Sequence, residues 1–169
     1  MKRAEIAYIA DIRPKRMDLL KERGQLPFAH RVGGGYTLRE AFQLKAMLTL
    51  MDGAGGGLGP DDARRLVVNA GGYAVERYGS SLADLIVSPG CWLGGVEFTG
   101  ENRAGVDERW LGWYAGPLDE LEDWMADQVQ RGAEGLRVPR AVRVLGLVNA
   151  TAEAAEVLSR ATELGIADG

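Results

Sequence analysis

Apolar residues recur with a helical period near the start of the chain and predict two short helices. Residues 5–10 are mostly apolar and form the first of them. The second covers residues 14–23, because proline is favoured at the first helical position, where its missing N–H costs no hydrogen bond. Gly24 then follows the helix as its C′ residue, where a positive φ angle is needed. The positions expected to face the core are Met17, Leu20 and Leu19.

A capping box and a second apolar stripe predict two more helices. Thr37 and Glu40 have the spacing at which each side chain binds the backbone N–H of the other residue. A glycine-rich stretch ends this third helix, and two aspartates favour the N-terminus of a fourth helix at residues 61–70. Before the third helix, residues 28–37 hold a basic segment, three glycines and a tyrosine, which is typical of a β-hairpin. The stripe of the third helix consists of Ala41, Leu44, Leu48 and Met51.

The pattern changes after residue 72 and predicts a small α/β domain. Residues 73–84 have a weak helical pattern, and residues 117–130 form an amphipathic helix with one acidic face. Thr151 is expected to cap a last helix that closes at Gly165. Stretches rich in β-branched and aromatic residues, bounded by glycine, proline or asparagine, predict strands at 85–88, 91–99, 108–115 and 140–148.

Composition and charge place the chain among soluble globular proteins with an uneven charge distribution. Of its 169 residues, 46% are hydrophobic and 26% are charged, which argues against wholesale disorder. Residues 1–66 contain 12 Lys and Arg against 8 Asp and Glu, a balance of +4, whereas residues 67–169 contain 8 against 16, a balance of −8. The split favours a first half that faces nucleic acid and a second half with another role.

The sequence contains no segment typical of membrane insertion or export. No run approaches the roughly 20 apolar residues of a membrane span. Asp11 and Arg13 interrupt the first residues before the apolar core of a signal peptide could form. We therefore expect a cytoplasmic protein with no membrane partner.

The residues that carry common enzymatic chemistry are sparse. His30 is the only histidine and Cys91 the only cysteine, so we expect no metal site, no cofactor and no internal disulfide. The glycines at 33–35 do not lie between a strand and a helix, as a phosphate-binding loop requires. The acidic residues at 119–127 are best interpreted as a solvated helix face. The sequence thus favours a protein that is not an enzyme.

An ordered set of residues in the first half follows the pattern of a known protein family. Residues 12–27 read IRPKRMDLLKERGQLP, and a basic segment with a Gly-Tyr pair and a leucine-rich helix follow. The set covers about residues 4–70 and resembles MerR-type winged helix-turn-helix domains, including phage excisionases and small terminase DNA-binding domains. Asp11 stands where that family has a glycine in the helix-turn-helix corner, and Asp18 where it often has an arginine. The matching positions are Pro14, Glu22, Gly24, Leu26, Pro27, Arg31, Gly35, Tyr36 and Leu44.

The resemblance implies both a fold and a function. The fold is α+β, with a MerR-like winged helix-turn-helix at residues 1–72 and a small α/β domain at 73–169 for dimerisation, effector binding or partner binding. The function is that of a transcriptional regulator which binds double-stranded DNA as a homodimer. It would read DNA with the helix at 14–23 and the basic wing at 28–37.

The residue types agree with this interpretation. Arg13, Lys15 and Arg16 lie at the N-terminal end of the proposed recognition helix, where Arg and Lys donate to O6 and N7 of guanine. Backbone contacts need cations and donors off the helix axis. The residues expected to supply them are Lys21, Arg31 and Tyr36.

Other interpretations of the sequence remain open. The chain could be a phage-type accessory factor, such as an excisionase or packaging component. It could also be an adaptor that keeps the winged fold without binding DNA, which Asp11, Asp18 and the acidic second half favour. The four tryptophans at 92–124 are expected to be core residues, with an aromatic pocket for a small-molecule effector, or a surface for a protein effector, as the alternative.

Overall fold

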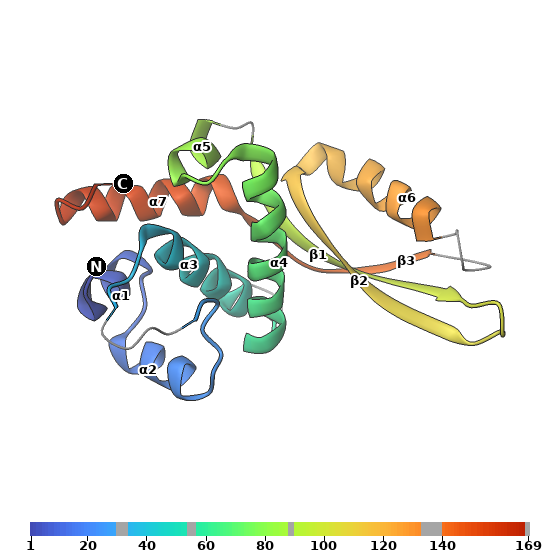
Figure 1. The fold of residues 1–169 in the computed structure, drawn as a ribbon, viewed down its shortest axis with the longest axis horizontal. Coiled ribbons are helices and arrows are strands. Elements are labelled where there is room, and N and C mark those ends of the chain that lie inside the picture. Colours follow the sequence, from blue (N-terminus) through green and yellow to red (C-terminus); the bar gives the residue numbers. More distant parts are fainter. Residues whose placement is uncertain (30–33, 54–56, 88–89, 133–139, 168–169) are drawn as a thin grey trace.

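A computed structural model describes residues 1–29, 34–53, 57–87, 90–132 and 140–167. Helices pack beside one half of a three-stranded sheet, and a further helix covers the other half (Figure 1). Within these residues, no helix is long and apolar enough to cross a membrane. The elements are α1 (Arg3–Ile9), α2 (Pro14–Glu22), α3 (Leu38–Asp52), α4 (Pro60–Tyr78), α5 (Leu82–Val87), β1 (Cys91–Glu101), β2 (Asp107–Pro117), a 3-10 turn (Leu118–Glu120), α6 (Leu121–Gly132), β3 (Arg140–Asn149) and α7 (Ala150–Glu163).

The local signals at the ends of the first helices act as predicted. Pro14 is the first residue of α2, and Gly24 follows the helix at φ 65°. The capping box is present, since the Glu40 N–H donates to Thr37 Oγ1 (3.1 Å) and the Thr37 N–H donates to a Glu40 carboxylate oxygen (2.8 Å). The expectation that Leu19 faces the core is wrong, because 43% of it is exposed while its neighbour Leu20 is buried.

The expected wing lies partly outside the described residues. Residues 30–33, with His30 and Arg31, are not described. The flanking residues 28–29 and 34–37 contain no strand, so the hairpin expected at 28–37 finds no support in them. In the described part, Tyr36 instead pairs with Met1: its N–H donates to the Met1 carbonyl (2.8 Å), and its carbonyl accepts from the chain's amino terminus (2.6 Å).

The fourth helix is longer than its sequence pattern suggests. α4 was expected at 61–70 but continues through Gly71 and Gly72 to Tyr78, so the boundary expected between residues 72 and 73 lies inside one helix. The helix continues past its glycines because its apolar stripe is also buried beyond them, and this burial outweighs the weak helix propensity of glycine. The buried apolar residues of this stripe are Ala63, Leu66, Val67, Ala70 and Ala74.

A single antiparallel sheet with the order β2-β1-β3 contains three of the four expected strands. This sheet makes the chain a mixed α and β protein, with seven α-helices in the described residues. The strand expected at 85–88 is wrong, because residues 82–87 form α5. Ser81 and Asp84 have the reciprocal bonds of a helix start: the Asp84 N–H donates to Ser81 Oγ (3.1 Å), and the Ser81 N–H donates to an Asp84 carboxylate oxygen (3.3 Å).

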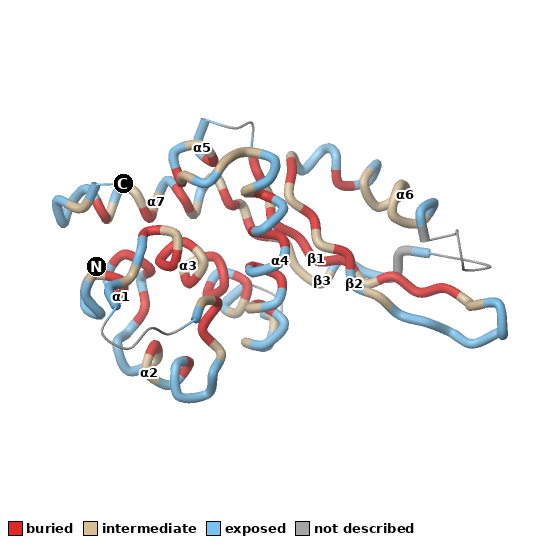
Figure 2. Tube along the Cα trace, in the orientation of Figure 1, coloured by how far each residue is buried: buried red, intermediate tan, exposed pale blue. Residues whose placement is uncertain are grey.

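The two faces of the sheet have separate apolar cores. On one face, Leu93 and Val148 are buried in the continuous core that the helices α1–α4 and α7 share. On the opposite face, Phe98 and Tyr114 are buried beneath α6, where Trp124 lies 6.0 Å and 5.2 Å from their rings. The buried tube in Figure 2 accordingly runs along the middle of the sheet and ends toward the β1–β2 hairpin.

The C-terminal helix closes the fold against the N-terminal helices. Asn149, rather than Thr151, caps α7, since its side chain accepts from the Ala152 N–H (3.0 Å). The expectation for Thr151 is wrong because its hydroxyl is used elsewhere: it donates to the Leu85 carbonyl (3.0 Å) and accepts from the Cys91 N–H (2.8 Å). Gly165 does follow the helix end at φ 67°. α7 then packs along α1 and α3 (Figure 1).

The capping box makes a measurable contribution to stability. We expect Thr37→Ala to lower the free energy of unfolding by about 1 kcal/mol, because one backbone N–H of α3 loses its acceptor. Urea denaturation checks this change. Thr162→Ala is the control, since that exposed hydroxyl bonds only within α7 and its loss should change stability by less than about 0.5 kcal/mol. Equal effects of the two substitutions would contradict the prediction.

Candidate nucleic-acid interface

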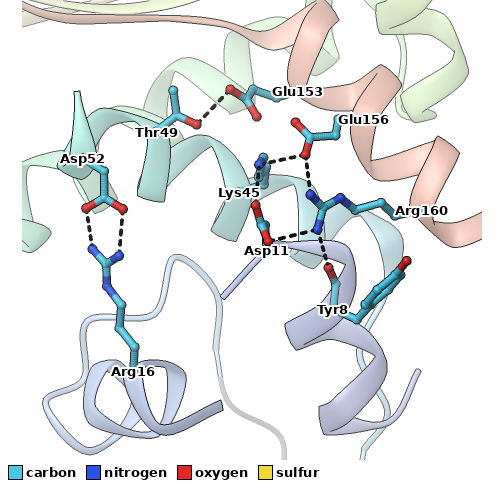
Figure 3. Close-up of polar contacts among 9 residues, drawn as sticks. All are labelled: Tyr8, Asp11, Arg16, Lys45, Thr49, Asp52, Glu153, Glu156 and Arg160. Carbon is cyan, nitrogen blue, oxygen red and sulfur yellow. Dashed lines mark hydrogen bonds and ion pairs between the residues drawn. The ribbon is translucent and has the colours of Figure 1, made fainter. Parts of the chain in front are cut away.

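The turn between α1 and α2 contains a residue in the left-handed region. Asp11 has φ 56°, the only positive φ at a non-glycine residue in the described structure. Aspartate adopts this conformation more readily than most residues, so it can stand where a glycine would be expected. Its carboxylate lies 3.1 Å from Arg160 of α7, which lowers the pKa of Asp11. The turn is thus held from the C-terminal helix as well as by its own backbone (Figure 3).

α2 presents one face to the core and the other to solvent. Met17 and Leu20 are buried, so the side of α2 that carries them faces the core. At 100° per residue, the positions opposite them form an outward stripe of Lys15, Leu19 and Glu22, all exposed. In Figure 1, α2 lies at the lower margin of the molecule, and no other helix or strand covers its outer side. This face is therefore accessible to a partner.

Three of the expected DNA-contacting residues carry free positive charges. Arg13, Lys15 and Lys21 are exposed, and none of them forms an ion pair within the described part of the chain. Arg13 occupies the N-cap position of α2 without a side-chain capping bond, Lys15 lies in the first turn and Lys21 in the last turn. The cations thus follow the whole length of α2.

Arg16 is not free. Its guanidinium makes two parallel hydrogen bonds of 2.7 Å to the carboxylate of Asp52 at the end of α3 (Figure 3). Arg16 holds the pKa of Asp52 below its usual range, and two-point geometry of this kind is the strongest that arginine forms with a carboxylate. Sequence spacing predicted a free Arg16 on the exposed face. It could not reveal the ion pair, because Asp52 lies 36 positions away in the chain.

Asp18 is paired as well, and its charge is neutralised. The Arg3 Nε–H of α1 donates to one Asp18 oxygen (2.9 Å), and a second guanidinium nitrogen donates to the other. The same arginine also bonds the carbonyl of Pro14 (3.3 Å). Asp18 therefore contributes to the packing of α1 on α2 and does not present an isolated negative charge on the surface of α2.

Tyr36 and Arg31 complete the list of expected contacts. Arg31 lies outside the described residues. Tyr36 is half-buried, and its ring packs edge-on against Phe28 with ring centroids 5.9 Å apart. Tyr36 thus has a packing role that its sequence position did not indicate.

One arginine of α4, Arg64, lies beside this surface, although sequence reasoning did not select it. Arg64 lines a surface groove of about 470 Å³ together with Lys21, Phe28 and Val68. Arg65 follows it and is exposed. The Arg64 Nε is buried without a hydrogen-bond acceptor in the described structure. The signal in the sequence was the Arg64-Arg65 pair, but only the tertiary packing shows that Arg64 lies next to the end of α2.

The described residues contain neither a cluster of metal-ligating side chains nor an activated thiol. Among them, no three His, Cys, Asp or Glu side chains gather as metal ligands would. Cys91 is buried at the start of β1, and burial raises the pKa of its thiol to about 11. A thiol of this kind is a poor nucleophile at neutral pH. The charged face of α2 is thus the surface that the sequence and the structure single out together.

Comparisons of the chain with models of protein families, with curated proteins and with solved structures found no match. A functional proposal for this protein therefore depends on its own side chains and their arrangement.

The Arg16–Asp52 pair has a predictable pH dependence. Because the folded-state pKa of Asp52 is depressed, the pair stabilises the fold at neutral pH, and this contribution is lost as pH falls through the usual carboxyl range and then through the depressed folded-state pKa. We expect Arg16→Ala to lower stability by at most about 1 kcal/mol at pH 7, since the pair is exposed, and to have no effect at the acid end.

Carboxyl chemical shifts measured by NMR during a pH titration test the cause. In Arg16→Ala the pKa of Asp52 should rise, while that of Asp11, which Arg160 depresses, should stay where it is. An unchanged Asp52 titration would show that Arg16 does not hold this carboxylate.

Proposed function

We propose that this chain binds double-stranded DNA and that α2 is its recognition helix. The observation that carries the proposal is the set of exposed cations along α2: Lys15 lies on its outward stripe, and Arg13 and Lys21 lie near its two ends, none with an ion-pair partner in the described structure. A helix that leaves a tight turn and presents cations at its N-terminal end fits the major groove of B-form DNA. Leu19, 43% exposed on the same face, offers an apolar contact for a thymine methyl group.

The surroundings of α2 supply the backbone contacts. Lys21 and Arg64 line the same groove, and Arg65 is exposed one residue further along α4. Side chains of this kind beside a recognition helix position it by contacts to phosphates. The charge balance of +4 over residues 1–66 supports the same assignment.

The pairing of Asp18 with Arg3 favours DNA binding over an adaptor role. An unpaired carboxylate in the middle of a recognition helix would repel phosphate, and Asp18 was one of three features, with Asp11 and the acidic second half, that favoured an adaptor without DNA binding. The bidentate contact with Arg3 removes most of this repulsion. On the outward stripe of α2 the charges of Lys15 and Glu22 offset each other, and Arg13 and Lys21 near the ends of the helix leave a positive balance around it.

We further propose that the protein acts as a transcriptional regulator, with two copies reading two half-sites. A single unit of this size makes few base contacts, and proteins that read DNA with one short helix commonly bind as dimers with twofold symmetry. The α2 surface would serve a phage-type accessory factor equally well, because both need the same contacts to DNA.

Salt-dependent binding to DNA tests the α2 face. We expect Arg13→Ala and Lys15→Ala each to weaken binding and to reduce the slope of log K against log salt by about 0.9, the value for one phosphate contact. Fluorescence anisotropy with a mixed-sequence duplex measures both quantities. Arg109→Ala is the matched control, since it removes one exposed charge from the sheet, away from α2. A slope that neither α2 substitution changes would exclude this face as the DNA contact.

Asp52 gives a second, independent test because it occupies the guanidinium of Arg16. Asp52→Asn keeps the shape of the side chain and removes its charge, so Arg16 becomes available to phosphate or guanine. We expect affinity for DNA to rise by about threefold to tenfold. Asp107→Asn, which removes an exposed carboxylate from the β1–β2 hairpin, should leave affinity nearly unchanged. Equal affinity of the two variants would mean that Arg16 takes no part in binding.

A further inference from the structure

β2 is an edge strand whose outer side lacks a strand partner in the described structure. The sheet order β2-β1-β3 gives β2 one neighbour only. Backbone N–H and C=O groups along such an edge remain available, and natural proteins cover or pair long edges to avoid indiscriminate association. β2 has 11 residues, so its edge is long enough to require an explanation.

A groove of about 570 Å³ runs along this edge. Its floor is residues 111–115 of β2, one wall is α4 and the other is α6. Apolar side chains are left exposed in it: Tyr73 of α4 is 52% exposed and Leu111 of β2 is 38% exposed. Trp113 lies between them, half-buried. The groove thus combines unpaired strand backbone with apolar surface that water covers in the single chain.

Each wall of the groove carries both an acid and a base. On α6, Asp127 and Arg131 lie one turn apart and pair with each other (2.8 Å). On α4, Glu76 lies beside Arg77, and Arg77 pairs with Glu120 (2.7 Å). A partner of one charge would meet a like charge on either wall. A partner surface on which an acid and a base stand in the opposite order would place opposite charges against both residues of each wall.

We propose that the occupant of this groove is the β2 edge of a second copy of this chain. A twofold axis perpendicular to the sheet, passing beside Trp113, would pair the two β2 strands antiparallel and join the two sheets into one of six strands. The same axis runs α6 antiparallel to its counterpart, so that Asp127 faces the partner's Arg131 and Arg131 faces the partner's Asp127. Leu111 then lies opposite the partner's Ala115 and loses its exposure to water.

This inference deepens the proposed function and rests on it for its biological purpose. A dimer of this kind would join two α2 helices through the sheet, as the binding of two half-sites requires. Its physical basis does not involve DNA. The test is therefore made without DNA, so that a failure of the dimer and a failure of DNA binding by α2 are observed separately.

The experiment is sedimentation equilibrium of the full chain at about 1–100 µM, the range in which a specific dimer of moderate affinity dissociates. We expect a monomer–dimer equilibrium. Leu111→Lys should raise the dimer dissociation constant at least about tenfold, because it places a charge on the pairing edge. Val144→Lys on β3 is the matched control, since Val144 is 42% exposed and lies outside the groove.

A charge exchange on α6 tests the symmetry itself. Asp127→Arg and Arg131→Asp should each weaken the dimer, because each sets like charges opposite each other at two places across the axis. The double variant D127R/R131D should restore the dissociation constant to within about threefold of the original, since opposite charges face each other again.

Circular dichroism spectra of all variants establish that they are folded. Three results would each overturn the proposal. The full chain could stay monomeric at the highest concentration, or Leu111→Lys and Val144→Lys could weaken the dimer equally. The third is a double α6 variant whose dimer dissociation constant is no lower than those of the single variants. The first result would point to an extended peptide of another protein as the occupant of the groove.

Discussion

Burial of α4 between the N-terminal helices and the sheet is the constraint on which the rest of this structure depends. α4 packs on α3 and also on strands β1 and β2. Leu66 approaches the sheet so closely that a Cβ at Gly95 would lie 3.2 Å from its methyl group, and Trp113 lies at the same distance. α3 also packs on β3 and α7 on β1, so α4 is the largest of several contacts that join the helical unit to the strands.

A second connection runs through α7, which combines buried apolar residues with polar contacts to α1 and α3. Arg160 bonds the carbonyl of Tyr8 at the end of α1 (3.0 Å), pairs with Asp11 in the turn and pairs with Glu156 on its own helix (2.9 Å) (Figure 3). Lys45 of α3 joins the same Glu156 (3.0 Å). These groups are partly exposed, so they contribute more to fixing the position of α7 than to overall stability. The turn before α2 is positioned by the last helix of the chain.

This arrangement places the two surfaces of interest on different parts of the molecule. α2 lies at the margin of the N-terminal unit, whereas the free edge of β2 lies on the other side of α4 (Figure 1). A contact made by one surface therefore leaves the other accessible. Because α4 contributes Arg64 near α2 and Tyr73 to the β2 groove, the two surfaces are connected through one rigid helix.

The sequence alone determined the elements whose signals are local. Pro14 and Gly24 delimit α2, and the Thr37–Glu40 capping box starts α3, because both depend on hydrogen bonds and φ angles within a few residues. The exposed cations Arg13, Lys15 and Lys21 were found in the same way.

Tertiary structure decided which of these local features were free and which were already engaged. Arg16 and Asp18 find partners at Asp52 and Arg3, 36 and 15 positions away, and Thr151 serves α5 and β1 instead of capping α7. α4 continues through two glycines because distant strands bury its apolar stripe. Pairings at such separations depend on the path of the whole chain, and no local pattern encodes them.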